Sequence, residues 1–599
     1  MNKIDPHYTF ADFFEKASDK VLAYELSTRL QEGNICVPSE LFENLVSNPF
    51  LSENEKYFSI EANELIGEDR NSITPFINYN NKYYLQRYFV YETEILEKIE
   101  QLIANEDPKE AQLALSVHMD FIKELFSGFQ PNAVSAEENI DWQCVGAINA
   151  VTNNFSIITG GPGTGKTTTV AKLLAIIYTM NPEAKVLLTA PTGKASARMK
   201  ESLQEAKEKL AVNEDIKKNF ENIESGTIHS QLGSIRNSHY FKHNSEQPLP
   251  FDVVIVDESS MISSTLMAKL LGAIKPTTKI IFLGDKNQLA SVEAGSIFGD
   301  FCLAQPEVKF KQSNIDFINQ FIKDKQAHIT ENYTTENSSN SLLNEHIVEL
   351  KRSYRFQGEE AIGLFSKAII ENNLTDTTIE KCDNPGEESV AITNIENEQR
   401  LEQMFEYYKE YILEKDIKKA LKKINLVKFL CATKKGNYGV ENFNKKIENY
   451  LQDKGLLRIN SRGFYENQPI LITKNNRALK LFNGDIGIVR KNKEGKYTAY
   501  FEGGETGVMS IPCNRIDHYK TVFAMTIHKS QGSEFKHVGI VLTDNEDMKL
   551  LTRELIYTGV TRAKETALIV GSKDILQKGI ARTVERASGL TERLTNAKN

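Results

Sequence analysis

One short segment constrains this 599-residue chain more than any other feature. Residues Gly160-Gly161-Pro162-Gly163-Thr164-Gly165-Lys166-Thr167 fit the pattern G-x-x-x-x-G-K-[ST] of a phosphate-binding loop. The loop follows an apolar run at Phe155–Thr159 and precedes a helical stretch at Thr168–Met180, which is the strand–loop–helix context that such a loop requires. Its glycines let backbone N–H groups turn toward phosphate oxygens. The segment therefore predicts a nucleoside triphosphate site in which Lys166 neutralises the β- and γ-phosphates and the Thr167 hydroxyl reaches Mg²⁺.

Two acidic residues and one amide supply the other groups that hydrolysis needs. Asp257 and Glu258 end an apolar run that predicts a strand at Val253–Val256. In that position Asp257 would hold Mg²⁺, and Glu258 would orient and deprotonate the attacking water. Gln288 follows another expected strand, Lys279–Leu283, from which its amide could touch the γ-phosphate. An isolated glutamine at such a place could equally bond to the backbone of its own loop.

The pattern of elements from residue 155 onward predicts an α/β fold with two parallel sheets. Buried-strand candidates alternate with helical stretches in two sets, at 155–159, 186–190, 253–256 and 279–283, and then at 391–393, 428–432, 521–525, 538–542 and 567–570. We expect a first lobe over residues 141–345, with a short hairpin at about 230–250, and a second lobe over residues 346–599. A glycine-punctuated stretch at 485–517 predicts a small antiparallel β insertion, and the polar stretch 312–344 predicts a loop or insertion between the lobes.

Residues 1–140 differ in charge from the rest of the chain. They hold 11 basic and 25 acidic side chains, whereas the whole chain has 72 basic and 81 acidic ones. Because phosphates repel an acidic surface, we expect a mostly helical domain that docks on a partner protein rather than on nucleic acid. An acidic, solvated face without a partner is an equally simple alternative. The aromatic-rich stretch at 57–91 is more typical of a core than of a platform for stacking bases.

The composition also sets the expected compartment. No stretch approaches the roughly 18 consecutive apolar residues of a membrane span. The first ten residues lack the apolar core of a secretion signal. The six cysteines are scattered, which argues against a zinc ribbon or a local disulfide framework. We therefore expect a cytoplasmic protein in reducing surroundings.

Motifs in a fixed order make the chain resemble a superfamily 1 helicase. The matching segments are the phosphate-binding loop, Thr189–Ala195 (motif Ia), Thr227–His229 (Ib), Asp257–Met261 (II), Gly284–Leu289 (III), Ser353–Phe356 (IV), Thr526–Phe535 (V) and Tyr557–Ala563 (VI). Gln143 stands where this superfamily has its adenine-contacting glutamine. Segments 160–174, 284–300, 481–487 and 552–564, with 33–38 near the N-terminus, resemble more narrowly the RecD family of SF1B helicases, the alpha subunits of exodeoxyribonuclease V.

The resemblance implies two RecA-like lobes with ATP and Mg²⁺ between them. The first lobe would supply Lys166, Thr167, Asp257, Glu258 and Gln288, and the second would supply Arg355 and Arg562 to stabilise transition-state charge. The residues implied to bind ATP are Gln143, Gly160, Gly161, Pro162, Gly163, Thr164, Gly165, Lys166 and Thr167. Those implied to contact single-stranded DNA are Thr192, Lys194, His229, Thr526, His528 and Lys529. A small SH3-like barrel is implied for the insertion at 485–517.

For function, the resemblance implies an ATP-dependent 5′ to 3′ DNA helicase in a three-chain helicase–nuclease with RecB-like and RecC-like partners. Such a complex processes double-strand DNA ends in homologous recombination. The motor motifs account for most of the chain, so the nuclease centre is expected on a partner. One alternative is a stand-alone RecD-like helicase, although those relatives have longer N-terminal regions. Another is a P-loop protein that binds nucleic acid as a switch without unwinding it, against which Glu258, Arg355 and Arg562 argue.

Overall fold

The computed structural model describes residues 5–43, 45, 48–51, 60, 63–133, 135–335, 341–355, 360–383, 389–460, 463–503, 507–543, 545 and 548–596. The backbone divides into two compact units. Unit 1 comprises the residues up to Lys286, Ala290–Ser353 and the residues from Glu585, and unit 2 comprises Asn287–Leu289 and Tyr354–Val584. Phe356 of the expected motif IV lies outside the described residues. Among the helices in these ranges, none combines the length and the apolar composition needed to span a membrane.

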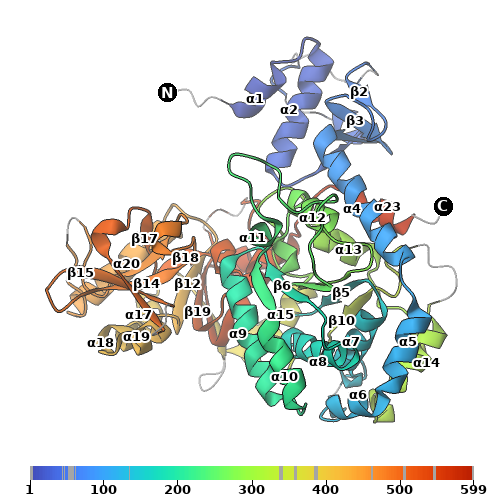
Figure 1. Cartoon of the computed structure of the whole chain (residues 1–599). Helices are drawn as coiled ribbons and strands as arrows, with labels where there is room; N and C mark the ends of the chain where they lie inside the picture. The colour runs from blue at the N-terminus through green and yellow to red at the C-terminus, as the bar shows by residue number, and fades with distance from the viewer. Residues whose placement is uncertain are drawn as a thin grey trace. The chain divides into compact units, whose positions relative to one another are not determined.

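Unit 1 is built on a six-stranded, all-parallel sheet (Figure 1). Its strand order is β10 (Ile347–Glu349), β5 (Phe155–Thr159), β9 (Lys279–Gly284), β8 (Val253–Val256), β6 (Val186–Ala190) and β7 (Glu224–Thr227). The four inner strands were predicted to within one residue, and the α/β class is confirmed. The two edge strands were not predicted, because they are too short and too poor in apolar residues to produce a recognisable run.

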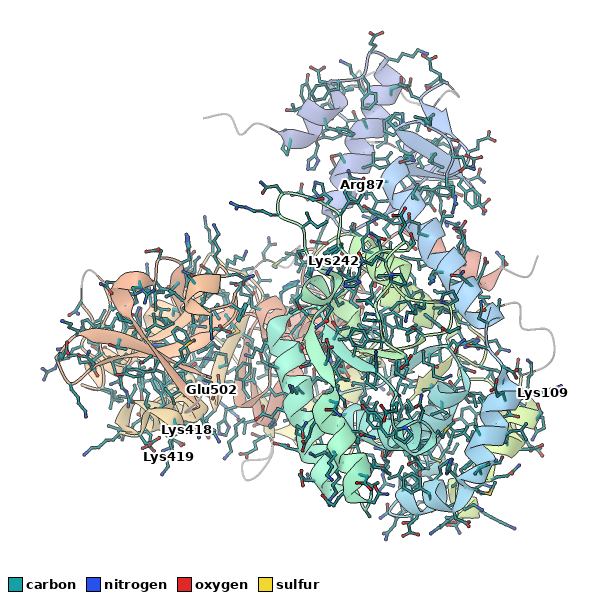
Figure 2. All side chains as sticks on the ribbon, in the orientation of Figure 1. Arg87, Lys109, Lys242, Lys418, Lys419 and Glu502 are labelled. Atoms are coloured by element: carbon teal, nitrogen blue, oxygen red, sulfur yellow. The ribbon has the colours of Figure 1, made fainter. Side chains whose placement is uncertain are left out.

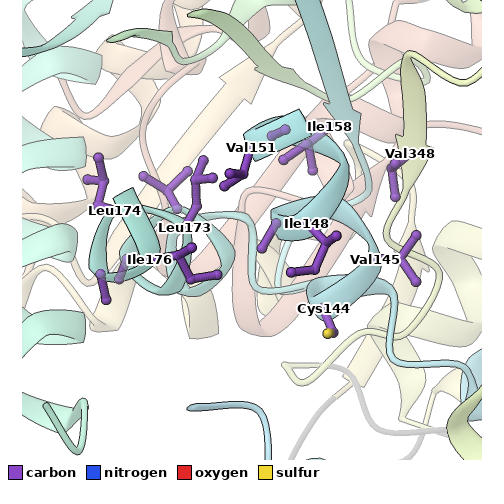
Figure 3. Packing of buried hydrophobic residues seen from close by; sticks show 14 of the residues in the cluster. Cys144, Val145, Ile148, Val151, Ile158, Leu173, Leu174, Ile176 and Val348 are labelled. Carbon is purple, nitrogen blue, oxygen red and sulfur yellow. The ribbon is translucent and has the colours of Figure 1, made fainter. Parts of the chain in front are cut away.

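Alternate residues of these strands point to opposite faces of the sheet, and different helices cover each face. Ile281 of β9 faces one core and its neighbour Ile280 faces the other. The helices of the first core include α7 (Trp142–Thr152), α8 (Lys166–Met180) and α9 (Gly193–Lys209), and those of the second include α11 (Ile228–Leu232), α12 (Ser264–Gly272) and α13 (Ile297–Ala304). Figure 3 shows the first core, where side chains of α7 and α8 pack beside Ile158 of β5 and Val348 of β10.

The N-terminal region is mostly helical, as the sequence predicted, and it also contains a small sheet that was not predicted. The helices are α1 (Pro6–Ala11), α2 (Ala17–Gln31), α3 (Glu40–Glu43), α4 (Gln86–Ala104), α5 (Pro108–Val117) and α6 (Met119–Leu125). The sheet has the strand order β1 (Cys36–Pro38), β4 (Lys82–Leu85), β3 (Phe76–Tyr79) and β2 (Ile66–Gly67). Strands of two to four residues are too short to show the alternation by which a sequence reveals a sheet.

The aromatic-rich stretch of this region forms a core, as the sequence predicted. It supplies β3, β4 and the start of α4, and Phe76 and Tyr84 are fully buried. Tyr57, at the start of the stretch, lies outside the described residues. Helix α4 ends before Pro108, and the Asp107 carboxylate caps α5 by accepting the N–H of Glu110 at 3.0 Å.

The residues from Glu585 onward return to unit 1, although the sequence assigned them to the second lobe. Helix α23 (Leu590–Thr595) packs against α4 and α13, where Leu590 and Leu594 are fully buried. The Arg593 guanidinium lies 5.2 Å from the ring centroid of Phe89 in α4. This tail therefore fastens α4 to the helices that cover the parallel sheet of unit 1. The sequence does not reveal the contacts of α23 with α4 and α13, because these helices lie hundreds of residues apart along the chain.

Replacing Leu594 by Ala should loosen this attachment. A leucine-to-alanine change in a packed core costs about 2–5 kcal/mol, and Leu594 is fully buried. We expect faster amide hydrogen exchange in α4 and α13 than in the unaltered chain, measured by mass spectrometry. Thr595→Ala changes an exposed position of the same helix and serves as the control. Equal exchange in the two variants would contradict the fastening role.

The polar stretch 312–344 is not the loop that its composition suggested, although residues 336–340 lie outside the described part. Residues Gln312–Asn319 form α14, and Ile315, Ile318 and Phe321 are buried in the core beneath α7. Apolar residues at helical spacing anchor a helix even within a polar composition. The boundary between the units also differs from the expected position after residue 345. It follows Ser353, because β10 pairs with β5 and so belongs to unit 1.

Unit 2 contains a second all-parallel sheet. Its strand order is β11 (Ser389–Thr393), β20 (Ala563–Val570), β19 (Phe535–Val541), β12 (Val427–Cys431) and β18 (Ala524–Thr526). One face is covered by α15 (Ala361–Ile370), α16 (Asp376–Cys382), α21 (Arg553–Val560) and α22 (Lys573–Ala581), and the other by α17 (Glu398–Glu406), α18 (Lys409–Leu413), α19 (Ile417–Lys423) and α20 (Val440–Asp453). The strand expected at 521–525 divides into β18 and a separate strand, β17 (Tyr519–Thr521).

Five antiparallel strands form another sheet within unit 2. Their order is β16 (Val508–Pro512), β15 (Tyr497–Glu502), β14 (Ile486–Lys491), β13 (Pro469–Ile472) and β17. The module spans 469–521 rather than the expected 485–517, because β13 and β17 complete its hydrogen bonding. It has its own core, which includes Ile470, Val489 and Phe501, while residues 504–506 lie outside the described part. Its likeness to an SH3 barrel stays a prediction.

Candidate nucleotide and DNA sites

The phosphate-binding loop connects β5 to α8 in unit 1. Gly163 and Gly165 have φ angles of +78° and +86°, which L side chains rarely adopt. At Gly160 an added Cβ would lie 2.8 Å from the Thr164 hydroxyl oxygen and 3.0 Å from the Leu350 carbonyl oxygen, so the loop has no space for a larger residue there. These glycines set the path of the loop. Helix α8 begins at Lys166, within this loop, and the N–H groups of a helix's first turn form a binding site for an anion.

Lys166 is the first residue of α8, and its ammonium reaches back across the loop. Nζ donates to the carbonyl oxygen of Gly160 at 2.5 Å and to that of Gly161 at 3.0 Å. The side chain is half-buried and joins no apolar core. Phosphate oxygens are charged and therefore stronger acceptors than neutral carbonyls. The ammonium thus lies where it could exchange its bonds to the loop for bonds to phosphate.

Gln143 approaches the same loop from α7. Its Nε2 donates to the carbonyl oxygen of Thr164 at 3.4 Å. Asp141 caps this helix, because its carboxylate accepts the N–H of Cys144 at 3.0 Å. Burial raises the pKa of Asp141 to about 6. The cap fixes the start of α7 and so holds Gln143 beside the loop, where its amide could contact the base of a bound nucleotide.

Asp257 and Glu258 follow the last residue of β8, and both are half-buried. The Asp257 carboxylate accepts the N–H of Glu258 at 2.9 Å. Burial and the nearby charge of Glu258 raise the pKa of Asp257 to about 6, while the Lys166 ammonium lowers it. Glu258 has a φ of +51°, in the left-handed region. That conformation costs a non-glycine residue on the order of 1–3 kcal/mol, a strain found chiefly where a functional side chain must take a set direction.

These groups fit a nucleoside triphosphate with Mg²⁺. The Thr167 hydroxyl and the Asp257 carboxylate offer the oxygen ligands that Mg²⁺ prefers. The effect of Lys166 on the pKa of Asp257 shows that the two charges belong to one electrostatic site. A divalent cation would favour the ionised form of Asp257 that burial makes costly.

Gln288 belongs to unit 2, not to the first lobe as the sequence predicted. Its segment, Asn287–Leu289, continues from β9, but its backbone bonds to motifs V and VI. The Leu289 N–H donates to the Thr558 hydroxyl at 3.0 Å, and Gln531 Nε2 donates to the Leu289 carbonyl at 3.0 Å. Spacing along the chain cannot reveal this placement, because these partners lie 269 and 242 residues further on.

The two arginines of unit 2 have different surroundings. Arg562 is buried, and its guanidinium donates to the carbonyl oxygens of Thr558 and Ser533, each at 3.2 Å. Both acceptors are neutral, so they leave its positive charge uncancelled. Arg355 instead pairs with the Glu534 carboxylate at 2.7 Å. To act on a phosphate, Arg355 would have to exchange that carboxylate for the new anion.

Thr192 and His229, expected to contact DNA, leave the same edge of the sheet in unit 1. Strands β6 and β7 are parallel, with Ala190 opposite Thr227, so the segments that follow them emerge side by side. Thr192 caps α9 through its side-chain oxygen, and Lys194 and His229 are exposed. The structure therefore brings these three side chains to one edge.

The expected hairpin between residues 230 and 250 is a short antiparallel pairing. Ser234 pairs with Phe241, and the N–H of Lys242 donates to the Gly233 carbonyl at 2.9 Å. Lys242 is labelled in Figure 2. Tyr240 at the hairpin is 74% exposed, and such a ring beside a lysine suits the stacking of bases and the binding of phosphates.

In unit 2 the residues expected to contact DNA lie at the end of β18. Thr526 is its last residue and is buried, while His528 and Lys529 lie in the 3-10 helix Ile527–Ser530. Burial lowers the pKa of Lys529, and the charges of Lys434 and Lys520 lower it further. The two neighbouring positive charges make the charge of Lys529 costly, so an anion beside them is favoured. We call Lys434, Lys520 and Lys529 the lysine cluster.

Sequence reasoning missed Lys434 and Lys520. Strands β12 and β18 are parallel, with Cys431 opposite Thr526. Lys434 and Lys529, each three residues further on, therefore leave the same edge of the sheet. A pair of lysines soon after an expected strand, as at Lys434-Lys435, is the signal that could have found this site.

Comparison with known proteins places the chain in a family. The AAA domain family matches residues 144–294, and the UvrD-like helicase C-terminal domain family matches residues 521–570. The RecBCD enzyme subunit RecD of Haemophilus influenzae is 34% identical over 626 aligned residues, which cover 95% of this chain and 92% of that protein. The chain belongs to the RecD family. The RecD subunit of Buchnera aphidicola subsp. Schizaphis graminum is 30% identical, with 96% of each chain covered.

The alignments of this RecD-family chain include its N-terminal region as well as both parallel sheets. A related protein, the ATP-dependent RecD2 DNA helicase of Deinococcus radiodurans, is 26% identical over 73% of this chain but only 50% of its own length. The two RecBCD subunits thus match 95% and 96% of the chain, whereas RecD2 matches 73%. The AAA match contains the phosphate-binding loop with Asp257 and Glu258, and the UvrD-like match contains Lys529 and Arg562.

Proposed function

We propose that this chain is an ATP-dependent DNA helicase, moving 5′ to 3′, and the RecD subunit of a RecBCD-type helicase–nuclease. The proposal is supported chiefly by the alignment with a RecBCD subunit over 95% of this chain, which contains the candidate groups for hydrolysis around Lys166 and Asp257. The direction of movement follows the RecD family. The complex acts in the cytoplasm on double-strand DNA ends during homologous recombination.

ATP hydrolysis rests on the groups around the loop of unit 1. Lys166 binds oxygens of the β- and γ-phosphates, and Thr167 with Asp257 holds Mg²⁺, which when bound neutralises phosphate charge. Glu258 orients the attacking water and accepts its proton. Gln288 responds to the γ-phosphate. Its segment is hydrogen-bonded to Thr558 and Gln531, so a shift of Gln288 toward the γ-phosphate moves motifs V and VI directly.

Arg562 and Arg355 stabilise the charge that develops during phosphoryl transfer. Arg562 has only neutral acceptors at its two hydrogen bonds and keeps its full charge for this role. Arg355 must first release Glu534, to which Lys564 is also bonded at 3.3 Å. Since Glu534 lies in motif V beside the DNA-contact residues, this exchange links nucleotide state to DNA contact.

Single-stranded DNA is bound without regard to sequence, through its phosphates and by base stacking. In unit 1 the contacts come from Thr192, Lys194 and His229 at one sheet edge. In unit 2 they come from Thr526, His528 and the lysine cluster. The acidic N-terminal region repels phosphate and docks on a RecC-like or RecB-like partner, and the nuclease centre belongs to a partner.

A native pull-down from the organism's own cells tests the subunit assignment. The chain carries an affinity tag, and the masses of co-purifying proteins are read by mass spectrometry, with an untagged strain as the control. We expect two large partners in equal amounts, one of them with a nuclease centre. The purified chain alone should hydrolyse ATP when single-stranded DNA is added and should leave linear DNA undegraded. Recovery of the chain without partners would contradict the assignment and favour a stand-alone helicase.

A further inference from the structure

The short strand that leads to the DNA contacts of unit 2 is held by side chains as well as by a neighbouring strand. Strand β18 is the last in its sheet and pairs with β12 through three residue pairs. The segment Val522–Ala524 follows β17 directly and ends in the first residue of β18. Lys520 lies just before this segment and Lys529 lies five residues after it. The position of the segment therefore sets where two members of the lysine cluster stand.

Asn444 of α20 takes the place of a neighbouring strand along this segment. Its Oδ1 accepts the N–H of Phe523 at 2.8 Å and that of Ala524 at 3.1 Å. Its Nδ2 donates to the Ala524 carbonyl at 3.1 Å and to the Val440 carbonyl, in its own helix, at 2.9 Å. The side chain is only 7% exposed. One buried amide thus satisfies three backbone groups of two successive residues.

Asn444 also ties this segment to the third lysine of the cluster. Its helix begins directly after the loop that carries Lys434, and the N–H of Glu441 in the first turn of α20 donates to the Lys434 carbonyl at 3.1 Å. The first turns of α20 therefore bond to the Lys434 loop through the backbone of Glu441 and to Phe523–Ala524 through the side chain of Asn444.

Two further buried side chains bind the same segment. The Tyr408 hydroxyl donates to the Phe523 carbonyl at 2.7 Å, and the Lys428 ammonium donates to the Val522 carbonyl at 2.9 Å. Both side chains are fully buried. Buried polar groups are costly unless they are bonded, and a fully bonded set fixes one backbone geometry. Apolar packing alone would hold β18 in the sheet but would not fix the backbone to this degree.

We propose that Asn444, Tyr408 and Lys428 are positioning residues for DNA binding, which hold the backbone that carries the lysine cluster. The proposal rests on the proposed function, because it takes the lysine cluster to be a DNA contact. These residues touch neither DNA nor nucleotide. They act through the backbone of Val522–Ala524 and through the start of α20.

The salt dependence of DNA affinity separates positioning from simple destabilisation. Each lost contact to a phosphate of single-stranded DNA reduces the magnitude of the slope of log affinity against log salt by about 0.7. A variant that is merely less stable has a smaller active fraction but an unchanged slope. The experiment titrates a fluorescent oligothymidylate with the purified full-length chain at several KCl concentrations. The active fraction of each preparation is measured by stoichiometric titration.

The chain offers a matched control for Tyr408. Tyr411 resembles Tyr408, since it is fully buried on α18 and donates its hydroxyl to a backbone carbonyl, that of Asn467, at 2.8 Å. Tyr411→Phe should therefore keep the affinity and the slope of the unaltered chain.

We expect Asn444→Ala to weaken binding about tenfold and to reduce the magnitude of the slope by about 0.7. Tyr408→Phe removes a single oxygen and keeps the ring, so it preserves the fold even if Asn444→Ala does not, and it should weaken binding about three- to fivefold. Lys529→Ala tests the DNA site itself and should lower the slope. An unchanged slope in both positioning variants, with a lowered slope in Lys529→Ala, would overturn the positioning role alone. An unchanged slope in Lys529→Ala as well would overturn the DNA site and the positioning role with it.

Discussion

Replacing Lys166 by Ala should nearly abolish ATP turnover while leaving the fold intact. The change removes the ammonium that lies across the phosphate-binding loop, and loss of one such charge-stabilising group costs about 10²–10³ in kcat. The side chain bonds only to the carbonyls of Gly160 and Gly161 and fills no core, so the free energy of unfolding should change by about 0.5 kcal/mol or less. Turnover is measured as phosphate release with saturating single-stranded DNA, and stability is measured by urea unfolding.

Lys209→Ala provides the control, because this exposed lysine at the end of α9 lies away from the loop. It should keep full turnover. Lys166→Ala should also bind ATP more weakly, since the lost ammonium contacts phosphates in the bound state. Turnover in Lys166→Ala equal to that of the unaltered chain would refute the nucleotide site in unit 1.

Glu258→Gln should retain ATP binding and lose hydrolysis. The amide has nearly the shape of the carboxylate but is a poor base, and a positioned general base contributes about 10²–10⁴ to the rate. The left-handed backbone at Glu258 can be kept by glutamine, so the end of β8 should not shift. Binding of a fluorescent ATP analogue and single-turnover hydrolysis measure the two properties separately.

Asp257→Asn is the informative companion to this variant. It should weaken the dependence of nucleotide binding on Mg²⁺, because Asp257 is proposed to hold the cation. Glu258→Gln should leave that dependence unchanged. Loss of nucleotide binding in Glu258→Gln would instead show that Glu258 supports the structure of the site rather than the chemistry.

Much of the fold could be predicted because its signals are local. The inner strands of the first sheet are continuous apolar runs, and a run of that kind is visible without any knowledge of its neighbours. The short edge strands β7 and β10 gave no such signal. Nor did the N-terminal sheet, whose strands have at most four residues. The polar composition around α14 concealed a helix, because only a few residues at helical spacing anchor it in the core.

The hydrolysis groups were predictable for the same reason. The loop from Gly160 to Thr167 is contiguous, and Asp257 and Glu258 adjoin each other at the end of one strand. The residues proposed for hydrolysis therefore lie in short segments that can be recognised in the sequence. Their surroundings were not predictable. Neither the pairing of Arg355 with Glu534 nor the burial of Arg562 among neutral carbonyls follows from a motif.

The sequence by itself determined the α/β class and the order of the helicase motifs, and it predicts the nucleotide site, since each depends on residues that are neighbours along the chain. Only the tertiary structure decided that Gln288 belongs to unit 2, that the C-terminal tail fastens α4, and that Lys434, Lys520 and Lys529 form one cluster. Each of these depends on contacts between segments far apart in the chain. Such contacts are fixed by packing and by hydrogen bonds that the folded backbone alone brings within reach.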